Sequence, residues 1–206
     1  MEENSSVGVL ILAGGLSERM PYPKPWLRFN SEQTFTEKIV DQYYRFGVDE
    51  LIVVLNEKYS GSQWTEQLSA INNYARIVIN GQSEKGRSYS LHLGLELIRD
   101  CSYAFVQNID NPFVDVNLLT LLAANSNEKG YTVPVHQGKG GHPILISRKI
   151  IHELRQFSYE SLNLREFLKN YPKIEVETSK KEILANINTE EDYKAYFNRD
   201  LNLSPA

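Results

Sequence analysis

The sequence predicts an α/β fold of three layers, α/β/α, with helices on both faces of a mostly parallel, Rossmann-like sheet. Strand and helix patterns alternate along the chain almost without interruption, which is typical of such a fold. The apolar run at residues 7–12 has the continuous character of a strand buried on both faces. It breaks at Gly14 and Gly15, and open α/β sheets bind their ligands at the carboxyl ends of such strands.

The first half of the chain supplies further strands and helices through its hydrophobic periodicity. Residues 35–46 predict a helix that ends at Gly47, where a left-handed cap is expected. Residues 88–99 place their apolar side chains on one face of a second long helix. The other predicted elements are strands at residues 51–55, 75–79 and 104–109 and a helix at residues 63–73.

The second half begins with the same alternation and then changes order. The glycine-rich turn at residues 138–141 leads into a short strand at 143–146, which we interpret as a hairpin or antiparallel excursion. The remaining predicted strands are at residues 131–136, 174–177 and 183–185, and the remaining helices are at 116–125, 149–156, 163–170 and 190–197.

The length and composition fit one domain. With 206 residues, of which 41% are hydrophobic, the chain can bury a single substantial core. We expect one domain over residues 1–206 with a flexible polar tail at about 198–206.

The amino terminus is acidic, unlike a secretory signal, and the apolar run behind it is too short to span a bilayer. The lone Cys101 cannot form an internal disulfide. These features predict a cytoplasmic protein without a membrane partner.

The charge distribution indicates a small anionic ligand. A net charge of -4 argues against a nucleic-acid partner, which usually requires a basic excess. Between residues 14 and 30 the sign reverses, because Arg19, Lys24 and Arg28 outnumber Glu18. A cationic patch on an acidic protein suits a small phosphorylated substrate. We expect the protein to be a monomer or a weak homo-oligomer.

The glycine turn has the composition of a phosphate-binding loop. Gly14 and Gly15 allow backbone N–H groups to approach phosphate oxygens, while Arg19 donates in a planar fork and Lys24 adds a compact charge. Neither the P-loop motif nor the dinucleotide fingerprint is present. The alternative is an ordinary strand-to-helix turn with two incidental surface cations.

This segment resembles a known signature, Leu-x-Gly-Gly-x-Ser-x-Arg-Met-(three residues)-Lys. It is typical of nucleotidyltransferases similar to molybdenum-cofactor guanylyl- and cytidylyltransferases. The matching residues are Leu12, Gly14, Gly15, Ser17, Arg19, Met20 and Lys24. The resemblance implies a fold of the nucleotide-diphospho-sugar transferase type. It also implies that a nucleoside triphosphate is bound by Leu12, Ala13, Gly14, Gly15, Ser17, Arg19 and Lys24. Arg19 and Lys24 would act on its phosphates as catalytic groups.

Two residues near this loop depart from the family pattern. Pro21 stands where the family usually has glycine, and proline lacks an N–H and has a restricted φ. The run Pro23-Lys24-Pro25 is closer to the sugar-nucleotide pyrophosphorylases, a related branch of the same fold. Trp26 follows, and it belongs either to the core or to a surface that stacks on a flat acceptor.

A carboxylate at the end of the predicted strand 104–109 is a candidate metal ligand. Asp110 precedes Asn111 and Pro112 and is presented at the same sheet edge as the glycine turn. Mg²⁺ prefers oxygen ligands and usually takes one or two from carboxylates. In the resembling family, an Asp-Gln-Pro or Asp-Met-Pro motif binds catalytic Mg²⁺ through its Asp, which implies this role for Asp110. The alternative is that Asp110 only caps a helix or turn.

Two motifs and one turn complete the resemblance. The Asn-Ile-Asn-Thr loop implies that Asn188 is the second metal ligand, although Thr189 and Asp192 also fit a simple helix cap. The segment at residues 86–91 resembles a Gly-x-x-x-Ser-Leu motif that contacts base and ribose, and it is equally an ordinary helix start. The residues implied there are Gly86, Arg87, Ser88 and Ser90. The Gly-His-Pro turn also resembles the family, which implies that His142 contacts the acceptor. The alternative is that His142 is only a turn residue.

These matches follow the family order from residue 9 to residue 193. They imply transfer of a nucleoside monophosphate from CTP or GTP to a phosphorylated acceptor, molybdopterin among the candidates, with release of pyrophosphate. The base stays open, because Leu-Ala-Gly-Gly resembles the guanylyl branch and Gly-His-Pro the cytidylyl branch. Two other functions also stay open. Pro23-Lys24-Pro25 favours a sugar-phosphate nucleotidyltransferase, and Pro21 is compatible with a non-catalytic nucleotide-binding regulatory protein.

Overall fold

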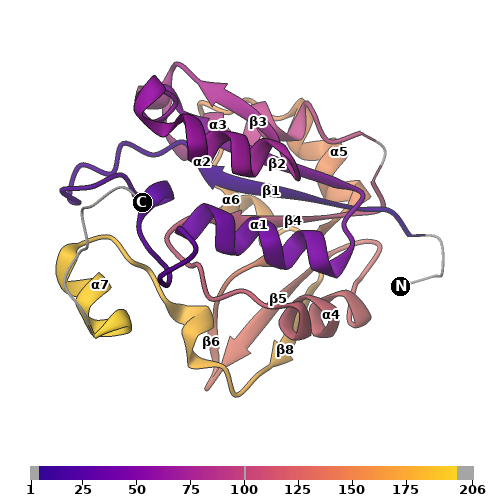
Figure 1. The fold of residues 1–206 in the computed structure, drawn as a ribbon. Coiled ribbons are helices and arrows are strands. Elements are labelled where there is room, and N and C mark those ends of the chain that lie inside the picture. The colour runs from indigo at the N-terminus through magenta and orange to yellow at the C-terminus, as the bar shows by residue number, and fades with distance from the viewer. Residues whose placement is uncertain (1–4, 100, 199–206) are drawn as a thin grey trace.

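The computed structural model describes residues 5–99 and 101–198, and it has helices on both sides of a central sheet (Figure 1). The strands are β1 (Val7–Ala13), β2 (Glu50–Asn56), β3 (Arg76–Asn80), β4 (Tyr103–Asn108), β5 (Tyr131–His136), β6 (Lys139–Gly140), β7 (Ile144–Ser147) and β8 (Lys173–Glu177). The α-helices are α1 (Phe35–Phe46), α2 (Thr65–Asn72), α3 (Gly86–Leu95), α4 (Val116–Ala124), α5 (Arg148–Gln156), α6 (Leu164–Leu168) and α7 (Glu190–Phe197). The predicted three-layer α/β class is confirmed.

The sheet is mostly parallel, in the order β3-β2-β1-β4-β7-β5-β6, and β8 also pairs with β5. β1 lies between β2 and β4 and runs parallel to both, with Leu12 opposite Val54 on one side and Asn108 on the other. β7 runs antiparallel to β4 and β5, as the glycine turn before it predicts. The carboxyl ends of β1 and β4 therefore lie side by side at one edge of the sheet.

Alternating side chains of β1 explain the two helical layers, because successive residues of a strand face opposite sides. Val9 and Ile11 pack in a core with α1, α2 and α4. Leu10 and Leu12 pack in a second core with α3 and α5. The continuous apolar run is thus covered on both faces.

Helix ends follow their capping residues. Thr34 forms a capping box at the start of α1, and Gly47 ends this helix with φ of 86°, as predicted. Thr189 and Asp192 form a second capping box at α7, and Asn198 ends that helix in the left-handed conformation. The rest of the predicted tail, 199–206, lies outside the described residues.

One predicted strand is wrong. The segment at 183–185 lies in and after a 3-10 helix, η5 (Lys181–Leu184). Its carbonyl groups do not need a neighbouring strand, because the buried side chain of Asn111 donates hydrogen bonds to the carbonyls of Glu182, Ile183 and Ala185. In the described part of the chain, no helix has the length and apolar character required to cross a membrane.

Candidate active site

A cavity of about 370 Å³ opens where β1 and β4 end and α3 begins. It brings together most of the residues singled out in the sequence. Those that line it are Leu12, Ala13, Gly14, Gly15, Ser17, Lys24, Gly86, Arg87, Ser90 and Asp110. The parallel register of β1 and β4 explains this, since it places the glycine turn and the Asp110 loop at one edge of the sheet.

The glycine turn needs its first glycine for packing and leaves its second one open. A Cβ at Gly14 would collide with the Oγ of Ser90, whereas a Cβ at Gly15 would meet no heavy atom within 4 Å. The main chain at Gly14 therefore packs against the start of α3. Ser17 has a φ of 52°, so the loop adopts a left-handed conformation before it turns back through a hydrogen bond from the Met20 N–H to the Ser17 carbonyl.

Buried asparagines end three strands around this turn, and the sequence reasoning missed them. Asn56 ends β2 and donates to the carbonyl of Gly14 at 3.1 Å. Asn80 ends β3 and donates to the Oγ of Ser90 at 2.9 Å. Asn108 ends β4 and lines the cavity itself. An asparagine closing each of three apolar strands was a readable signal in the sequence.

Lys24 joins the two predicted metal ligands. Its Nζ donates to the Oδ1 of Asn188 at 2.6 Å. Burial lowers the pKa of Lys24, and the nearby negative charge of Asp110 opposes this shift. Burial likewise raises the pKa of Asp110, opposed by the positive charges of Lys24 and Arg87. Asn188 thus contacts the Lys24 ammonium directly, and Asp110 lines the same cavity as Lys24.

This donor set fits Mg²⁺. Asp110 offers carboxylate oxygens and Asn188 an amide oxygen, which are the hard ligands that Mg²⁺ prefers. The positive ammonium group of Lys24 lies against the Oδ1 of Asn188, so this oxygen already has a cationic partner. Across the described residues, no three His, Cys, Asp or Glu side chains gather into a metal-binding group. Mg²⁺ bound by one or two protein oxygens usually takes its other ligands from substrate phosphates and water.

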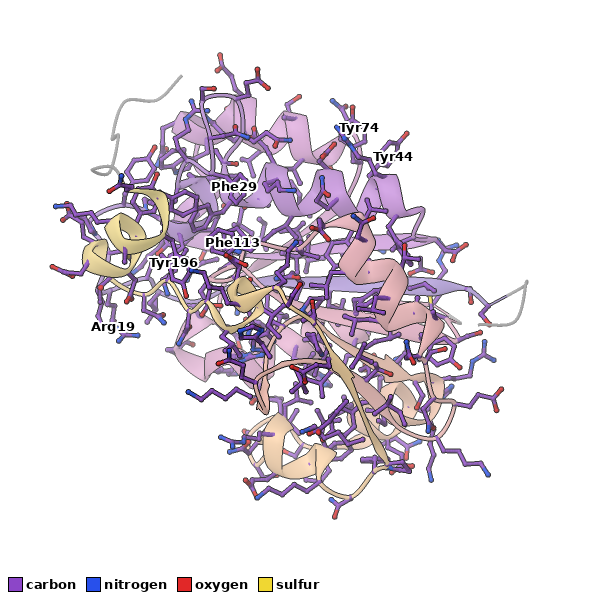
Figure 2. All side chains as sticks on the ribbon, turned by 90° about the horizontal axis from the view of Figure 1, so that it is seen from below. Arg19, Phe29, Tyr44, Tyr74, Phe113 and Tyr196 are labelled. Atoms are coloured by element: carbon purple, nitrogen blue, oxygen red, sulfur yellow. The ribbon has the colours of Figure 1, made fainter. Side chains whose placement is uncertain are left out.

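Arg19, Ser88 and the predicted metal ligand Asn188 are not among the residues that line this cavity. Arg19 is exposed at the edge of the molecule beside α7 (Figure 2). Its charge still reaches the site, because it contributes to the lowered pKa of Lys24 after the larger effect of burial. Ser88 lies on the other side of Arg87, and its Oγ donates to the carbonyl of Leu162 at 2.6 Å.

A second cavity of about 830 Å³ adjoins the first, because Arg87 lines both. His142 lines this second cavity, and its Nε2 lies 3.0 Å from the Nδ2 of Asn108. Burial and then the charge of Arg87 lower the pKa of His142 to about 4, so its imidazole is neutral at neutral pH. The lining of this cavity also includes three more cationic residues, Arg165, Lys169 and Lys173. Asp and Glu do not occur among its described lining residues.

The floor of the second cavity is apolar. It includes Leu91, Val133, Ile144, Leu162 and Leu168, which also belong to the core beneath α3 and α5. An apolar floor under a cationic rim suits a ligand with an uncharged body and an anionic group.

Trp26 belongs to the core and is not available to an acceptor. It lies in the short helix η1 (Lys24–Trp26), is 2% exposed, and stacks on Trp64 with ring centroids 5.7 Å apart. Pro21, in contrast, is exposed and lies outside the residues that line the first cavity.

Replacing Pro21 with glycine is therefore expected to leave triphosphate affinity nearly unchanged. Because glycine gives the unfolded chain more freedom, stability should fall by up to about 1 kcal/mol. Calorimetric titration with a nucleoside triphosphate and thermal unfolding measure the two effects. A clear gain in affinity in Pro21→Gly would mean that proline displaces an N–H that the phosphate loop requires.

Known proteins resemble this chain over most of its length. The family model described as MobA-like NTP transferase domain matches residues 9–176. A molybdenum cofactor cytidylyltransferase of Escherichia coli (strain K12) is 25% identical over 192 residues, which are 92% of this chain and 94% of that protein.

Two solved structures share the fold. Rv0371c of Mycobacterium tuberculosis H37Rv, in complex with manganese, has a TM-score of 0.75 at 18% identity, covering 95% of this chain and 99% of that one. A nucleotidyl transferase from Methanothermobacter thermautotroptrophicus also has a TM-score of 0.75, at 22% identity, covering 95% of this chain and 97% of that one. At these identities the two structures establish the fold alone.

Proposed function

The chain belongs to the MobA-like NTP transferase family, and on this premise we propose that it transfers a nucleoside monophosphate from CTP or GTP to a phosphorylated acceptor. The observation that carries the proposal is the shared cavity, in which the glycine turn, Lys24 and Asp110 face one another. In this proposal the glycine turn and Lys24 bind the phosphates, and Asp110 binds the cation.

We place the nucleotide in the first cavity. The triphosphate would lie along the glycine turn, where Gly15 leaves room for close approach to the main chain and Lys24 supplies a positive charge. Gly86, Arg87 and Ser90, at the start of α3, would border the base and ribose. We place exposed Arg19 at the outer phosphates, since its charge acts on Lys24 from the solvent side.

We place the acceptor in the second cavity. A ligand there would meet Arg87, which lines both cavities, and His142, whose neutral imidazole can accept or donate one hydrogen bond. The apolar floor and cationic rim favour an acceptor with a ring system and a phosphate. Molybdopterin is the first candidate, and CTP the first donor, because the Escherichia coli relative is a molybdenum cofactor cytidylyltransferase.

The proposed reaction is a direct displacement at the α-phosphorus. An oxygen of the acceptor phosphate forms the new P–O bond, and the bond to the leaving pyrophosphate breaks. Such a transfer depends on positioning and charge neutralisation more than on covalent help from the protein. Asp110 and Asn188 would hold Mg²⁺, which supplies positive charge to phosphate oxygens. Lys24 would neutralise the triphosphate and then the released pyrophosphate.

The test is pyrophosphate release with Mg²⁺ and either CTP or GTP, in the presence of molybdopterin or of a sugar phosphate. Release that requires molybdopterin supports the proposal, and the preferred nucleotide identifies the base. Pyrophosphate release only with a sugar phosphate would identify the chain as a sugar-phosphate nucleotidyltransferase. Thermal stabilisation by a triphosphate without any release would instead indicate a nucleotide-binding protein that lacks catalysis.

A further inference from the structure

Asn111 ties together two segments of the proposed metal site that lie far apart in the sequence. It follows Asp110 directly and is 2% exposed. Its Nδ2 lies 3.1, 2.8 and 3.0 Å from the carbonyl oxygens of Glu182, Ile183 and Ala185, respectively. An amide nitrogen has two hydrogens, so they are shared among three acceptors. One buried side chain thus provides hydrogen bonds for the main chain that leads toward Asn188.

A main-chain hydrogen bond continues this connection next to the proposed ligands. The Ile187 N–H donates to the carbonyl of Asp110 at 2.9 Å. Asn188 comes next, and its own N–H donates to the Oδ2 of Asp192 at 2.9 Å. Contacts at residues 110 and 111 therefore connect the two main-chain segments that carry the Asp110 carboxylate and the Asn188 amide. The amide itself accepts from Lys24 Nζ at 2.6 Å and donates to the Asn186 carbonyl at 3.1 Å.

Asn111 is itself anchored from the core. Gln107, which is fully buried in β4, donates from its Nε2 to the carbonyls of Asn108 and Asn111, both at 2.8 Å. The hydroxyl of Tyr43, in α1, donates to the Oε1 of Gln107 at 3.1 Å. A chain of buried polar groups thus runs from α1 through β4 to Asn111.

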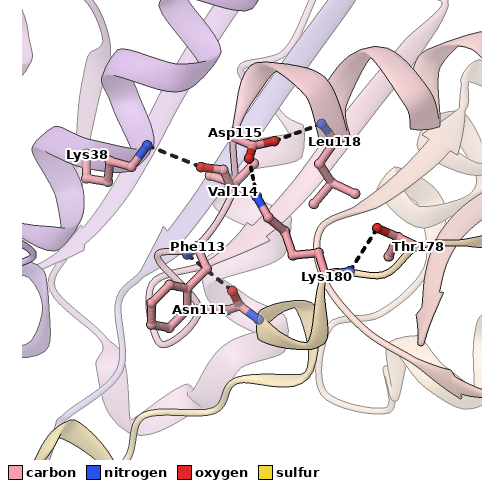
Figure 3. A network of polar contacts seen from close by, with 8 residues as sticks. All are labelled: Lys38, Asn111, Phe113, Val114, Asp115, Leu118, Thr178 and Lys180. Atoms are coloured by element: carbon pink, nitrogen blue, oxygen red, sulfur yellow. Dashed lines mark hydrogen bonds and ion pairs between the residues drawn. The ribbon is translucent and has the colours of Figure 1, made fainter. Parts of the chain in front are cut away.

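A second link between the same segments lies further from the site. Lys180 pairs with Asp115, whose Oδ1 caps α4 by accepting a hydrogen bond from the Leu118 N–H (Figure 3). Both charged side chains remain partly exposed, at 29% for Lys180 and 35% for Asp115. This outer pair can be removed without changing any hydrogen bond of Asn111, which provides a matched comparison.

We propose that Asn111 is a positioning residue that holds Asn188 in register with Asp110 and so builds the cation site. The inference rests on the proposed function, because the role of both oxygens as metal ligands is part of it. A cation held by one carboxylate and one amide on separate segments needs both segments fixed. Groups that orient metal ligands typically contribute 10- to 100-fold to metal affinity.

The experiment measures binding of Mn²⁺ to the full chain by electron paramagnetic resonance, first alone and then with a saturating nucleoside triphosphate. Asn111→Ala is expected to weaken Mn²⁺ binding by about 10- to 100-fold relative to the wild type. Asn111→Ser retains one hydroxyl donor, so its Mn²⁺ affinity should lie between those of the wild type and Asn111→Ala. This variant also keeps the test possible if Asn111→Ala fails to fold. Lys180→Met and the remote Asn170→Ala, which removes an exposed side-chain bond to the Phe167 carbonyl, should bind Mn²⁺ like the wild type.

Two failures are distinguishable. If the wild type binds Mn²⁺ and the folded Asn111 variants bind it equally well, the positioning role is overturned while the metal site stands. If the wild type itself binds Mn²⁺ neither alone nor with a saturating nucleoside triphosphate, the metal assignment of the proposed function fails, and the role of Asn111 falls with it. Equal loss in Lys180→Met would show that any loosening of this region has the effect, which also overturns the specific role of Asn111.

Discussion

Replacing Asp110 with asparagine is expected to slow Mg²⁺-dependent nucleotidyl transfer by about 10²–10³-fold, the usual effect of losing one electrostatic group at a reaction centre. The reason is its place in the cavity. Burial raises the pKa of its carboxyl group, and the positive charges of Lys24 and Arg87, which line the same cavity, oppose this shift. Asparagine has nearly the same shape but offers no negative charge to a cation.

The fold should tolerate this change, because Asp110 follows β4 and lines a cavity instead of packing in either core. Pyrophosphate release gives the rate, and circular dichroism checks that the variant is folded. Asp41→Asn is the matched control, since it makes the same chemical change on the surface of α1. Activity of Asp110→Asn within about threefold of the wild type would contradict its assignment as a metal ligand.

Replacing Lys24 with methionine is expected to weaken triphosphate binding far more than monophosphate binding. Lys24 contacts Asn188 and lines the same cavity as the glycine turn, where the outer phosphates would lie. A hydrogen bond to a charged group contributes about 1.5–3 kcal/mol, which corresponds to an affinity loss of roughly 10- to 150-fold for the triphosphate. A monophosphate lacks the outer phosphates and should lose little.

Isothermal titration with a nucleoside triphosphate and its monophosphate distinguishes these outcomes. Lys129→Met serves as the control, because Lys129 is an exposed lysine in the turn before β5. Equal losses for the two nucleotides would place Lys24 at the sugar or at the α-phosphate, and no loss for either would remove it from the nucleotide site.

The fold could be predicted well because its main signals are local. The apolar run of β1 and the glycines after it indicate a buried parallel strand, and the periodicity of the flanking segments indicates the helices. The strand expected at 183–185 could not be predicted correctly, because its carbonyls are satisfied by Asn111, more than 70 residues earlier. Local hydrophobic patterns contain no information about a partner at that distance.

The candidate site was predictable in part for the same reason. Motif residues at the ends of β1 and β4 meet in one cavity because parallel strands share an edge. The motif gave no indication that Arg19 would lie outside that lining. Nor could spacing predict that Asn108 would contact His142 across the boundary between the two cavities. Such details depend on how side chains pack after the sheet is formed.

The stacked pair of Trp26 and Trp64 provides an intrinsic fluorescence probe. These are the only two tryptophans of the sequence, and both lie in one aromatic cluster with Tyr22. Trp26 shares the short helix η1 with Lys24. Indole emission therefore originates from a single location next to the phosphate loop. Nucleotide titrations and stopped-flow measurements can follow that loop by intrinsic fluorescence, without attaching a dye to the protein.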